Sequence, residues 1–224
     1  MNLFILLSLL AAVAIVSSLI TNFIRYVSIK NKLYDTPNDR SSHDIPIPKG
    51  GGLSIVLILL IAIGFLFFNH QIDSDISMSL LIGLSLVAVV GFIDDYKNLP
   101  VSIRALAYVL VAVLSIYLIG GVSALSINNY QLQLNEFGYP LAVLFVVWIT
   151  NLYNFMDGTD GFAAIQTICV GLFCGVLLYL SANTSYAILL FCLVASTIGF
   201  LYWNWSPAKI FMGDVGSSFI GFIF

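Results

Sequence analysis

Carboxylates in three short motifs are the residues of this chain whose type and spacing are suited to chemistry. Five of the 11 acidic residues belong to the motifs. These are Gly91-Phe92-Ile93-Asp94-Asp95, Asn154-Phe155-Met156-Asp157-Gly158-Thr159-Asp160-Gly161 and Phe211-Met212-Gly213-Asp214-Val215-Gly216-Ser217. The rest of the chain is hydrocarbon-like, with 60% hydrophobic and 8% charged residues. A charge at bilayer depth costs several kcal/mol, so carboxylates are retained there only for a task. Gathered at one face of a membrane, they indicate a magnesium-dependent phosphate site.

Asp94 and Asp95 end an apolar run that is predicted to be a helix. Two adjacent carboxylates there repel each other and meet the negative end of the helix dipole. A divalent cation or a substrate proton would offset both effects. A solvated helix end before Asn98 and Pro100 would explain one aspartate alone, so the pair favours a functional interpretation.

Asn151, Asn154 and Asp157 are spaced by three residues, which places them near one another on a helical surface. Asp157-Gly158 and Asp160-Gly161 are turn signals that end this helix. The next helix begins near Gly161, and its N-terminus would favour an anion such as diphosphate. An EF-hand is excluded because its ligand spacing and closing glutamate are missing. The alternative is an N-capped loop with ordinary Asp-Gly turns.

Asp214 lies between glycines that allow a backbone to approach a ligand closely. Together with the earlier carboxylates it would supply the few oxygen ligands that Mg²⁺ takes beside substrate phosphates, and Mn²⁺ is a second option. Phe211 is suited to stacking on a base, although a phenylalanine in a membrane helix is normally a packing residue.

Basic residues flank the acidic motifs. Lys97 and Arg104 would hold phosphate, or serve only as topology markers. Lys49-Gly50-Gly51-Gly52 opens a predicted span, where the glycines either allow close helix packing or form a backbone anion nest beside a lysine.

Long apolar runs must position these residues. A mean hydropathy of +1.04 excludes a soluble domain, and several runs approach the ~20 residues that span a bilayer. We predict a single integral membrane domain over residues 1–224 that is all-α and polytopic, with seven transmembrane helices and the start of an eighth. The predicted spans are Leu3–Ile24, Leu53–Phe68, Met78–Ile93, Val101–Gly120, Tyr139–Leu152, Phe162–Ala182 and Tyr186–Trp203, followed by Ser217–Phe224. Because this last run stops after two turns, we expect the chain to be truncated at its C-terminus.

The orientation follows from the eight Lys and Arg residues, which all fall in or beside alternate loops. The positive-inside rule places these loops in the cytoplasm and the N-terminus outside. The segment from Val122 to Gly138, which contains no Lys or Arg, would then be external, and a short β-hairpin with a turn at Asn128-Asn129 is one option for it.

Taken together, the motifs resemble those of the polyprenyl-phosphate N-acetylhexosamine-1-phosphate transferases. These enzymes initiate O-antigen, enterobacterial common antigen and teichoic acid synthesis, and are relatives of phospho-MurNAc-pentapeptide transferase. The likeness covers the whole chain in order. It comprises Asp35–His43 with Pro46–Gly52, Asp94-Asp95, the Asn-x-x-Asn-x-x-Asp-Gly-x-Asp-Gly pattern of Asn151–Gly161, and the Phe-Met-Gly-Asp-x-Gly-Ser pattern of Phe211–Ser217.

The resemblance implies transfer of a sugar-1-phosphate from a UDP-N-acetylhexosamine to undecaprenyl phosphate, with release of UMP. It implies that Asp214 ligates magnesium, that Asp94 deprotonates or orients the lipid phosphate, and that Asp95 assists. Phe211 would stack on uracil. The remaining substrate-binding residues would be Lys49 and Lys97 at phosphates, and Asn151, Asn154, Asp157, Asp160 and Gly161 toward the nucleotide.

The resemblance also implies a multi-pass protein of the bacterial inner membrane with its site facing the cytoplasm. Its partners would be membrane lipid, undecaprenyl phosphate and the UDP-sugar, with no nucleic acid, and a homodimer stays open. The loop motif with Arg40-Ser41-Ser42-His43 is closer to the lipopolysaccharide branch of surface-polysaccharide synthesis than to the peptidoglycan branch. The family's later spans and its histidine-rich loop are missing, so an inactive truncated homologue is an alternative. A transporter using the aspartates is the other.

Overall fold

Helices make up most of the computed structural model, which describes residues 2–37, 45–127 and 130–224. In chain order the elements are α1 (Leu3–Lys30), β1 (Tyr34–Asp35), β2 (Ile47–Pro48), α2 (Leu53–Phe68), α3 (Ser74–Lys97), α4 (Val101–Ile119), β3 (Ala124–Ile127), β4 (Tyr130–Gln133), η1 (Asn135–Phe137), α5 (Gly138–Met156), α6 (Phe162–Leu180), α7 (Thr184–Asn204) and α8 (Asp214–Ile223). His43 and the predicted turn at Asn128-Asn129 lie outside the described residues.

Within the described part of the chain, six helices are long and apolar enough to cross a membrane. They are α1, α3, α4, α5 with η1, α6 and α7. The segment Leu53–Phe68, which we predicted to be a further span, forms α2 with 16 residues. That is shorter than the ~20 residues that a span typically needs.

Near the acidic motifs, two helices extend beyond the predicted spans. The third span was predicted to reach about Ile93 with Asp94 and Asp95 at the helix end, and α3 continues to Lys97, so both aspartates lie in its last turns. Lys97 near the C-terminal end suits the helix dipole. The last helix was expected from Ser217, but α8 begins at Asp214, because an acidic residue is favourable in a first turn.

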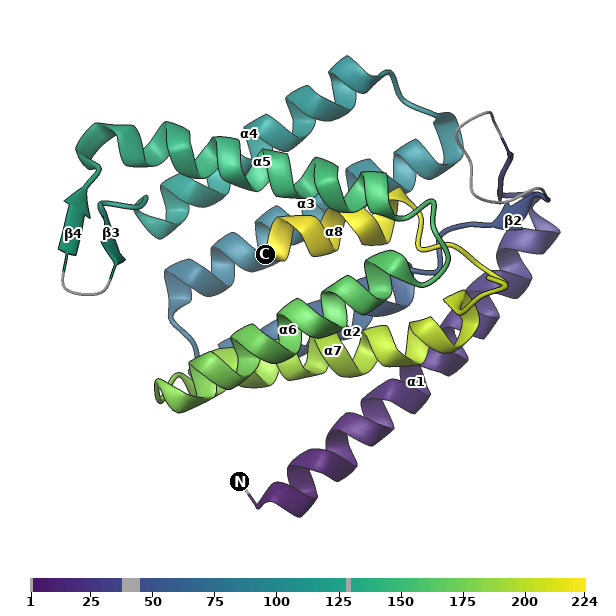
Figure 1. Cartoon of the computed structure of the whole chain (residues 1–224), viewed down its shortest axis with the longest axis horizontal. Coiled ribbons are helices and arrows are strands. Elements are labelled where there is room, and N and C mark those ends of the chain that lie inside the picture. The colour runs from purple at the N-terminus through teal and green to yellow at the C-terminus, as the bar shows by residue number, and fades with distance from the viewer. Residues whose placement is uncertain (1, 38–44, 128–129) are drawn as a thin grey trace.

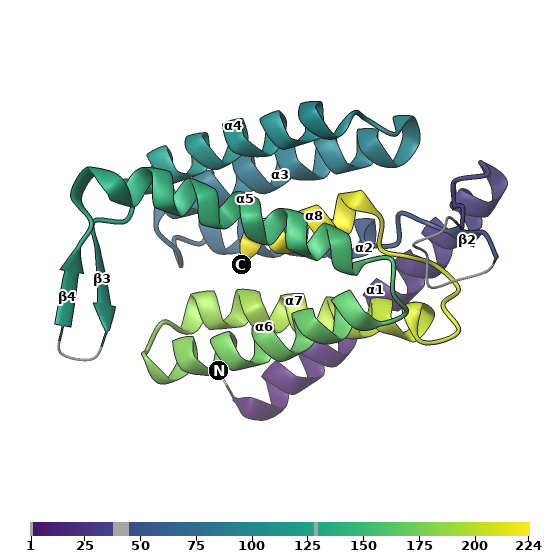
Figure 2. The same ribbon diagram turned by 45° about the horizontal axis from the view of Figure 1, so that its top comes forward.

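The short α8 lies at the centre of the bundle. It packs against α3 and α5 and, by a smaller contact, against α2. Figures 1 and 2 show α3, α4 and α5 on one side of it and α6, α7 and α1 on the other. Every residue from Val215 to Phe222 is buried. A helix that is buried all round must be apolar or small on every face, as α8 is.

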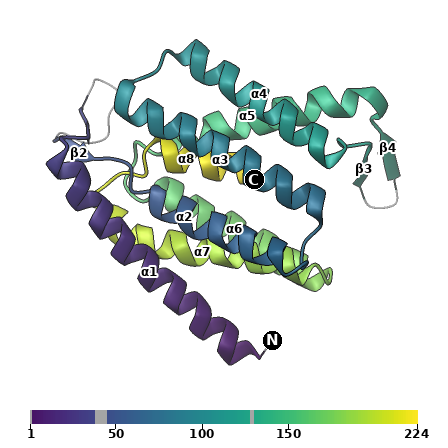
Figure 3. The ribbon, with the colours of Figure 1, turned by 180° about the vertical axis from the view of Figure 1, so that it is seen from behind.

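Helix α1 lies at the edge of this arrangement. It contacts α7 and α2, and seen from behind it runs diagonally, with its N-terminal part away from the other helices (Figure 3). Polar side chains join it to the bundle. Ser17 Oγ donates to the carbonyl of Ser196 at 2.6 Å, and Thr21 Oγ1 lies 2.8 Å from Ser54 Oγ. Such interhelical hydrogen bonds hold apolar helices together where lipid offers no partner.

Two pairs of short strands lie at opposite ends of the bundle (Figure 1). Strands β3 and β4 pair antiparallel, with Leu125 opposite Leu132. At the other end β1 pairs antiparallel with β2, with Asp35 opposite Ile47. This second pair brings Asp35 close to the residue that follows β2, Lys49.

The backbones of α2 and α8 touch where α2 begins. A Cβ added at Gly52 would collide with the Cα of Gly216 and with Met212. Gly52 also donates its N–H to the carbonyl of Met212 at 2.8 Å. The glycines before α2 therefore serve close packing, which is one of the two interpretations considered above.

We predict that Gly52→Ala lowers the unfolding temperature in detergent, because forcing a methyl group into a packed contact costs about 1–3 kcal/mol. Gly64→Ala on the same helix is the matched control. Apart from the backbone of its own helix and its two chain neighbours, no atom lies within 4 Å of a Cβ at Gly64, and alanine is favoured over glycine inside a helix by ~1 kcal/mol. Equal unfolding temperatures for the two variants would contradict the close contact.

Candidate active site

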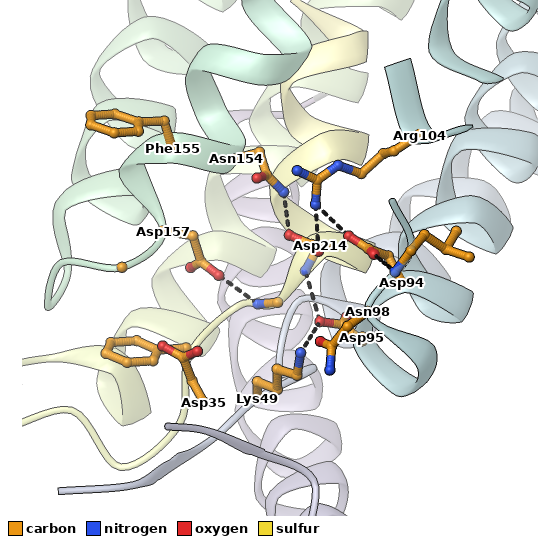
Figure 4. A pocket seen from close by; sticks show the side chains of 14 residues that line it. Asp35, Lys49, Asp94, Asp95, Asn98, Arg104, Asn154, Phe155, Asp157 and Asp214 are labelled. Atoms are coloured by element: carbon orange, nitrogen blue, oxygen red, sulfur yellow. Dashed lines mark hydrogen bonds and ion pairs between the residues drawn. The ribbon is translucent and has the colours of Figure 1, made fainter. Parts of the chain in front are cut away.

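The acidic motifs meet in one cavity of about 480 Å³ at the end of the bundle that carries β1 and β2. Five separate segments of the chain supply its wall (Figure 4). The lining residues are Asp35, Lys49, Asp94, Asp95, Asn98, Leu99, Arg104, Asn154, Phe155, Asp157, Gly158, Phe211, Gly213 and Asp214. The structure thus brings four of the five predicted carboxylates to one cavity, namely Asp94, Asp95, Asp157 and Asp214.

Two carboxylates hold the loop that leads into α8. Asp157 accepts the N–H groups of Met212 at 3.1 Å and Gly213 at 2.6 Å. Asp95 accepts those of Asp214 and Val215, each at 3.1 Å. Four consecutive backbone donors are therefore bound by side chains from α3 and the end of α5. Three of them lie at the start of α8, where N–H groups have no partner within the helix.

Gly213 is required at the centre of this loop. Its φ is +77°, and a Cβ there would lie 2.7 Å from Asp95 Oδ2. A side chain would both strain the backbone and displace the carboxylate that holds Asp214.

Asp95 is 3% exposed, and its charge is compensated from two directions. Lys49 Nζ lies 3.5 Å from Asp95 Oδ1. The N-terminus of α8, to which Asp95 is bonded, carries the positive end of the helix dipole. Both oxygens of Asp95 are therefore engaged in positioning the start of α8.

Asp94 and Asp214 share one basic partner. Arg104 Nη1 donates to Asp94 Oδ2 and lies 3.2 Å from Asp214 Oδ2. The tight turn between α3 and α4 makes this possible, because Asn98 adopts a left-handed conformation with φ of 48°. The turn also lets the N–H of Leu99 donate to Asp94 Oδ1 at 2.6 Å.

Asn154 completes the surroundings of Asp214. Its Nδ2 donates to Asp214 Oδ1 and lies 3.3 Å from Ser217 Oγ. Asn154 stands at the end of α5, one turn before Asp157, as the three-residue spacing predicted.

Asp157 has an unusual charge environment. Burial raises the pKa of its carboxyl to about 7, the N–H groups of Gly213 and Met212 lower the pKa, and the carboxylates of Asp95 and Asp35 raise it. The residue as a whole is partly exposed, but its carboxylate is enclosed by the loop that it binds. This group therefore titrates near neutrality, far above the usual value near 4.

The donor set fits a magnesium ion that keeps part of its ligand shell for other molecules. Among the described residues, no group of three or more Asp, Glu, His or Cys side chains forms a cage for a metal. Mg²⁺ is usually held by one or two carboxylates plus substrate phosphates. Asp94 and Asp214 meet that requirement, since both point at a single cationic nitrogen. Asp94 would therefore hold such an ion together with the predicted ligand Asp214.

Four predicted binding residues do not line the cavity. Asn151 is exposed, and its amide donates to the carbonyl of Val147 at 2.8 Å. Lys97 is exposed on the last turn of α3. Asp160 accepts the N–H of Ala208 at 3.1 Å, and the N–H of Gly161 donates to Asn204 Oδ1 at 3.1 Å. That last bond occupies one N–H group that we expected an anion to meet.

The proposed anion nest before α2 is also contradicted. Gly51 and Gly52 donate their N–H groups to the carbonyls of Phe211 and Met212, at 3.0 and 2.8 Å. These donors are thus used inside the protein, and Lys49 alone remains as the cationic group of this motif in the cavity.

Sequence reasoning missed four lining residues, Asp35, Asn98, Leu99 and Phe155, and left Arg104 open. Phe155 is 85% exposed, whereas Phe211 is 2% exposed, so Phe155 offers the larger free aromatic face at the cavity. Its place between Asn154 and Asp157 was a usable signal. For Arg104, the signal was a basic residue one turn into the helix that follows Asp94-Asp95 and a proline.

Comparison with known proteins agrees with this geometry. The profile described as "Glycosyl transferase family 4" matches residues 77–224, more than half of the chain, including most of α3 and its two aspartates. The chain is a member of glycosyl transferase family 4. This family 4 chain contains all three acidic motifs within the matched region.

Curated relatives support the assignment to family 4. A probable undecaprenyl-phosphate N-acetylglucosaminyl 1-phosphate transferase of Bacillus subtilis (strain 168) is 32% identical over 207 residues, covering 91% of this chain and 57% of that protein. An undecaprenyl-phosphate alpha-N-acetylglucosaminyl 1-phosphate transferase of Yersinia pestis is 34% identical over 208 residues, covering 88% and 55%. A phospho-N-acetylmuramoyl-pentapeptide-transferase of Streptococcus pneumoniae (strain Taiwan19F-14) is 33% identical over 185 residues, covering 78% and 56%.

The chain spans a little more than half the length of these relatives. The apolar helices and the bacterial relatives together identify this family 4 chain as a multi-pass membrane protein.

We predict that Asp157→Asn loosens the loop before α8. An amide cannot accept both the Met212 and Gly213 N–H groups as a carboxylate does, and a hydrogen bond to a charged group contributes ~1.5–3 kcal/mol. Hydrogen exchange at residues 212 and 213 should become about tenfold faster or more. Asp160→Asn is the matched control and should affect exchange at Ala208 instead. Unchanged exchange at 212 and 213 in Asp157→Asn would disprove the role.

Proposed function

We propose that this chain forms part of an enzyme that transfers an N-acetylhexosamine-1-phosphate from a UDP-sugar to undecaprenyl phosphate and releases UMP. The observation that carries the proposal is the convergence of Asp94, Asp214, Lys49 and Arg104 on one cavity. Two phosphate-bearing substrates repel each other, and a site that joins them must neutralise charge and fix their geometry.

The names of the relatives support the same reaction class. Two are named for transfer of N-acetylglucosaminyl 1-phosphate with undecaprenyl phosphate, and one for phospho-N-acetylmuramoyl-pentapeptide transfer. All three names describe movement of a phosphorylated amino sugar.

Within this proposal, Asp94 orients or deprotonates the lipid phosphate from the wall of the cavity. Asp214 would hold the metal with Asp94, and Mg²⁺ when bound would neutralise phosphate charge (Mn²⁺ could replace it). Lys49 and Arg104 would meet phosphates, while Asp95 and Asp157 hold the Asp214 loop in place.

The cavity also has the mixed surroundings that the two substrates need. At the edge of the cavity, the uracil base would contact either the exposed ring of Phe155 or the buried ring of Phe211. Exposed apolar side chains of α3 and α4 lie near the same end, with Phe92 44% exposed and Val101 71% exposed. We propose that such side chains contact the prenyl tail, so that the lipid reaches the phosphate site from the bilayer.

The proposal includes an orientation and a location. The cavity would face the cytoplasm of a bacterial inner membrane, with the N-terminus and the β3–β4 pair outside. The basic residues near the cavity end support this through the positive-inside rule. The product would start a surface polysaccharide such as the O-antigen of lipopolysaccharide.

The test is UMP release by membranes that carry the chain, alone and with any downstream sequence of its gene. UDP-N-acetylglucosamine, UDP-N-acetylgalactosamine and the UDP-MurNAc-pentapeptide would be supplied in turn. We expect release from one of them that requires both undecaprenyl phosphate and Mg²⁺. Release without the lipid, or from none of the sugars in either form of the protein, would refute the proposal. Ion flux without nucleotide turnover would support a transporter instead.

We predict that Asp214→Asn lowers UMP release by at least about two orders of magnitude, the size of loss typical for a key electrostatic group. Asn151→Ala is a control on the same cytoplasmic end, and it should cost less than about threefold because Asn151 lies outside the cavity. Equal losses in the two variants would show that the cavity is not the reacting site.

A further inference from the structure

A single nitrogen atom bridges the two carboxylates that line the centre of the cavity. Arg104 Nη1 donates to Asp94 Oδ2 and to Asp214 Oδ2, and Figure 4 shows the guanidinium between the two side chains. In the described part of the chain, the ion pairs of Asp94 and Asp214 both go to Arg104, whereas Lys49 pairs with Asp95.

Asp94 and Asp214 are held close together, so a cation is needed to offset the repulsion between their carboxylates. Leu99 N–H fixes Asp94 Oδ1 at 2.6 Å. Asp95 fixes the backbone of Asp214, and Asn154 fixes its Oδ1. Because each side chain has one oxygen bound elsewhere, the pair cannot simply turn apart. Two carboxylates that share a site disfavour each other's ionisation unless a positive group lies between them.

Arg104 differs from the carboxylates in its freedom to move. Its side chain is 21% exposed, compared with 3% for Asp94 and 23% for Asp214, so exposure distinguishes Arg104 from Asp94 but not from Asp214. It borders the open cavity and its long aliphatic stem can rotate, whereas the carboxylates are fixed from behind. The oxygens that face Arg104 are also the ones that a divalent cation would use.

We propose that Arg104 is an internal competitor for the metal, so that the guanidinium and the divalent cation exchange at the same two carboxylate oxygens. This inference rests on the metal assignment of the proposed function. It adds that the metal affinity of the substrate-free protein is held down by Arg104, and that metal entry requires the guanidinium to leave Asp94 and Asp214.

The first measurement is Mn²⁺ binding to the detergent-purified chain without substrate, followed by electron paramagnetic resonance of free Mn²⁺. Arg104→Gln removes the competing charge, and we expect its Kd for Mn²⁺ to fall at least about tenfold, or ~1.4 kcal/mol. Arg104→Lys keeps a positive charge and should stay within about threefold of the unchanged chain. Lys97→Gln is the matched control: it removes one charge close in sequence but outside the cavity, and its Kd should not fall.

A Kd that is unchanged or higher in Arg104→Gln would overturn the proposal, as would an equal fall in Lys97→Gln. Absence of Mn²⁺ binding in both the unchanged chain and Arg104→Gln would also overturn it. Circular dichroism and size-exclusion chromatography check that each variant is folded.

A second measurement needs no variant. In the chain labelled with ¹⁵N-arginine, which contains Arg25, Arg40 and Arg104, saturating Mg²⁺ should shift the guanidinium signal of Arg104 and leave that of Arg25 in place. An unshifted Arg104 signal would refute the exchange. Neither measurement uses turnover, so both remain informative if the UMP-release experiment fails.

Discussion

Four backbone N–H groups in a row, from Met212 to Val215, are bound by two carboxylates, and the candidate site depends on this contact. Asp157 comes from the end of α5 and Asp95 from α3, so the loop is held between two helices that are distant in sequence. The contact also satisfies donors at the start of α8 that the helix itself cannot satisfy. Asp214 is thereby fixed in the cavity by groups other than its own side chain.

Division of labour among the aspartates follows from this arrangement. Asp95 and Asp157 bind the backbone donors of the loop before α8, while Asp94 and Asp214 each direct one oxygen at Arg104. The four residues belong to short acidic motifs, yet one pair holds the loop before α8 and the other pair faces Arg104. All four residues line the cavity, so their positions alone do not distinguish these roles. The roles are distinguished by the hydrogen-bond partners of each carboxylate.

The sequence was sufficient to predict a helical membrane protein and to bring the three acidic motifs together, because charges among apolar runs are rare and expensive. The sequence was a weaker guide to which side chains point into the cavity. Asn151 and Asn154 have the same residue type and lie one turn apart, but only Asn154 reaches the cavity. Lys97 follows the aspartates directly but is exposed, whereas Arg104 returns to them across the left-handed turn at Asn98. Distance along the chain is a poor guide where the backbone reverses.

The burial of α8 has a consequence for how this protein can vary. Asp214 is the first residue of a helix whose next eight residues are buried among α2, α3 and α5. The backbone of Asp214 therefore cannot move independently of this helix. A larger side chain on α8 would push the whole helix and carry Asp214 with it. Change at these positions is therefore expected as compensating pairs across the helix contacts, because the effects of neighbouring residues do not add independently. Which substitutions the candidate site tolerates therefore depends on the packing of α8 inside the bundle.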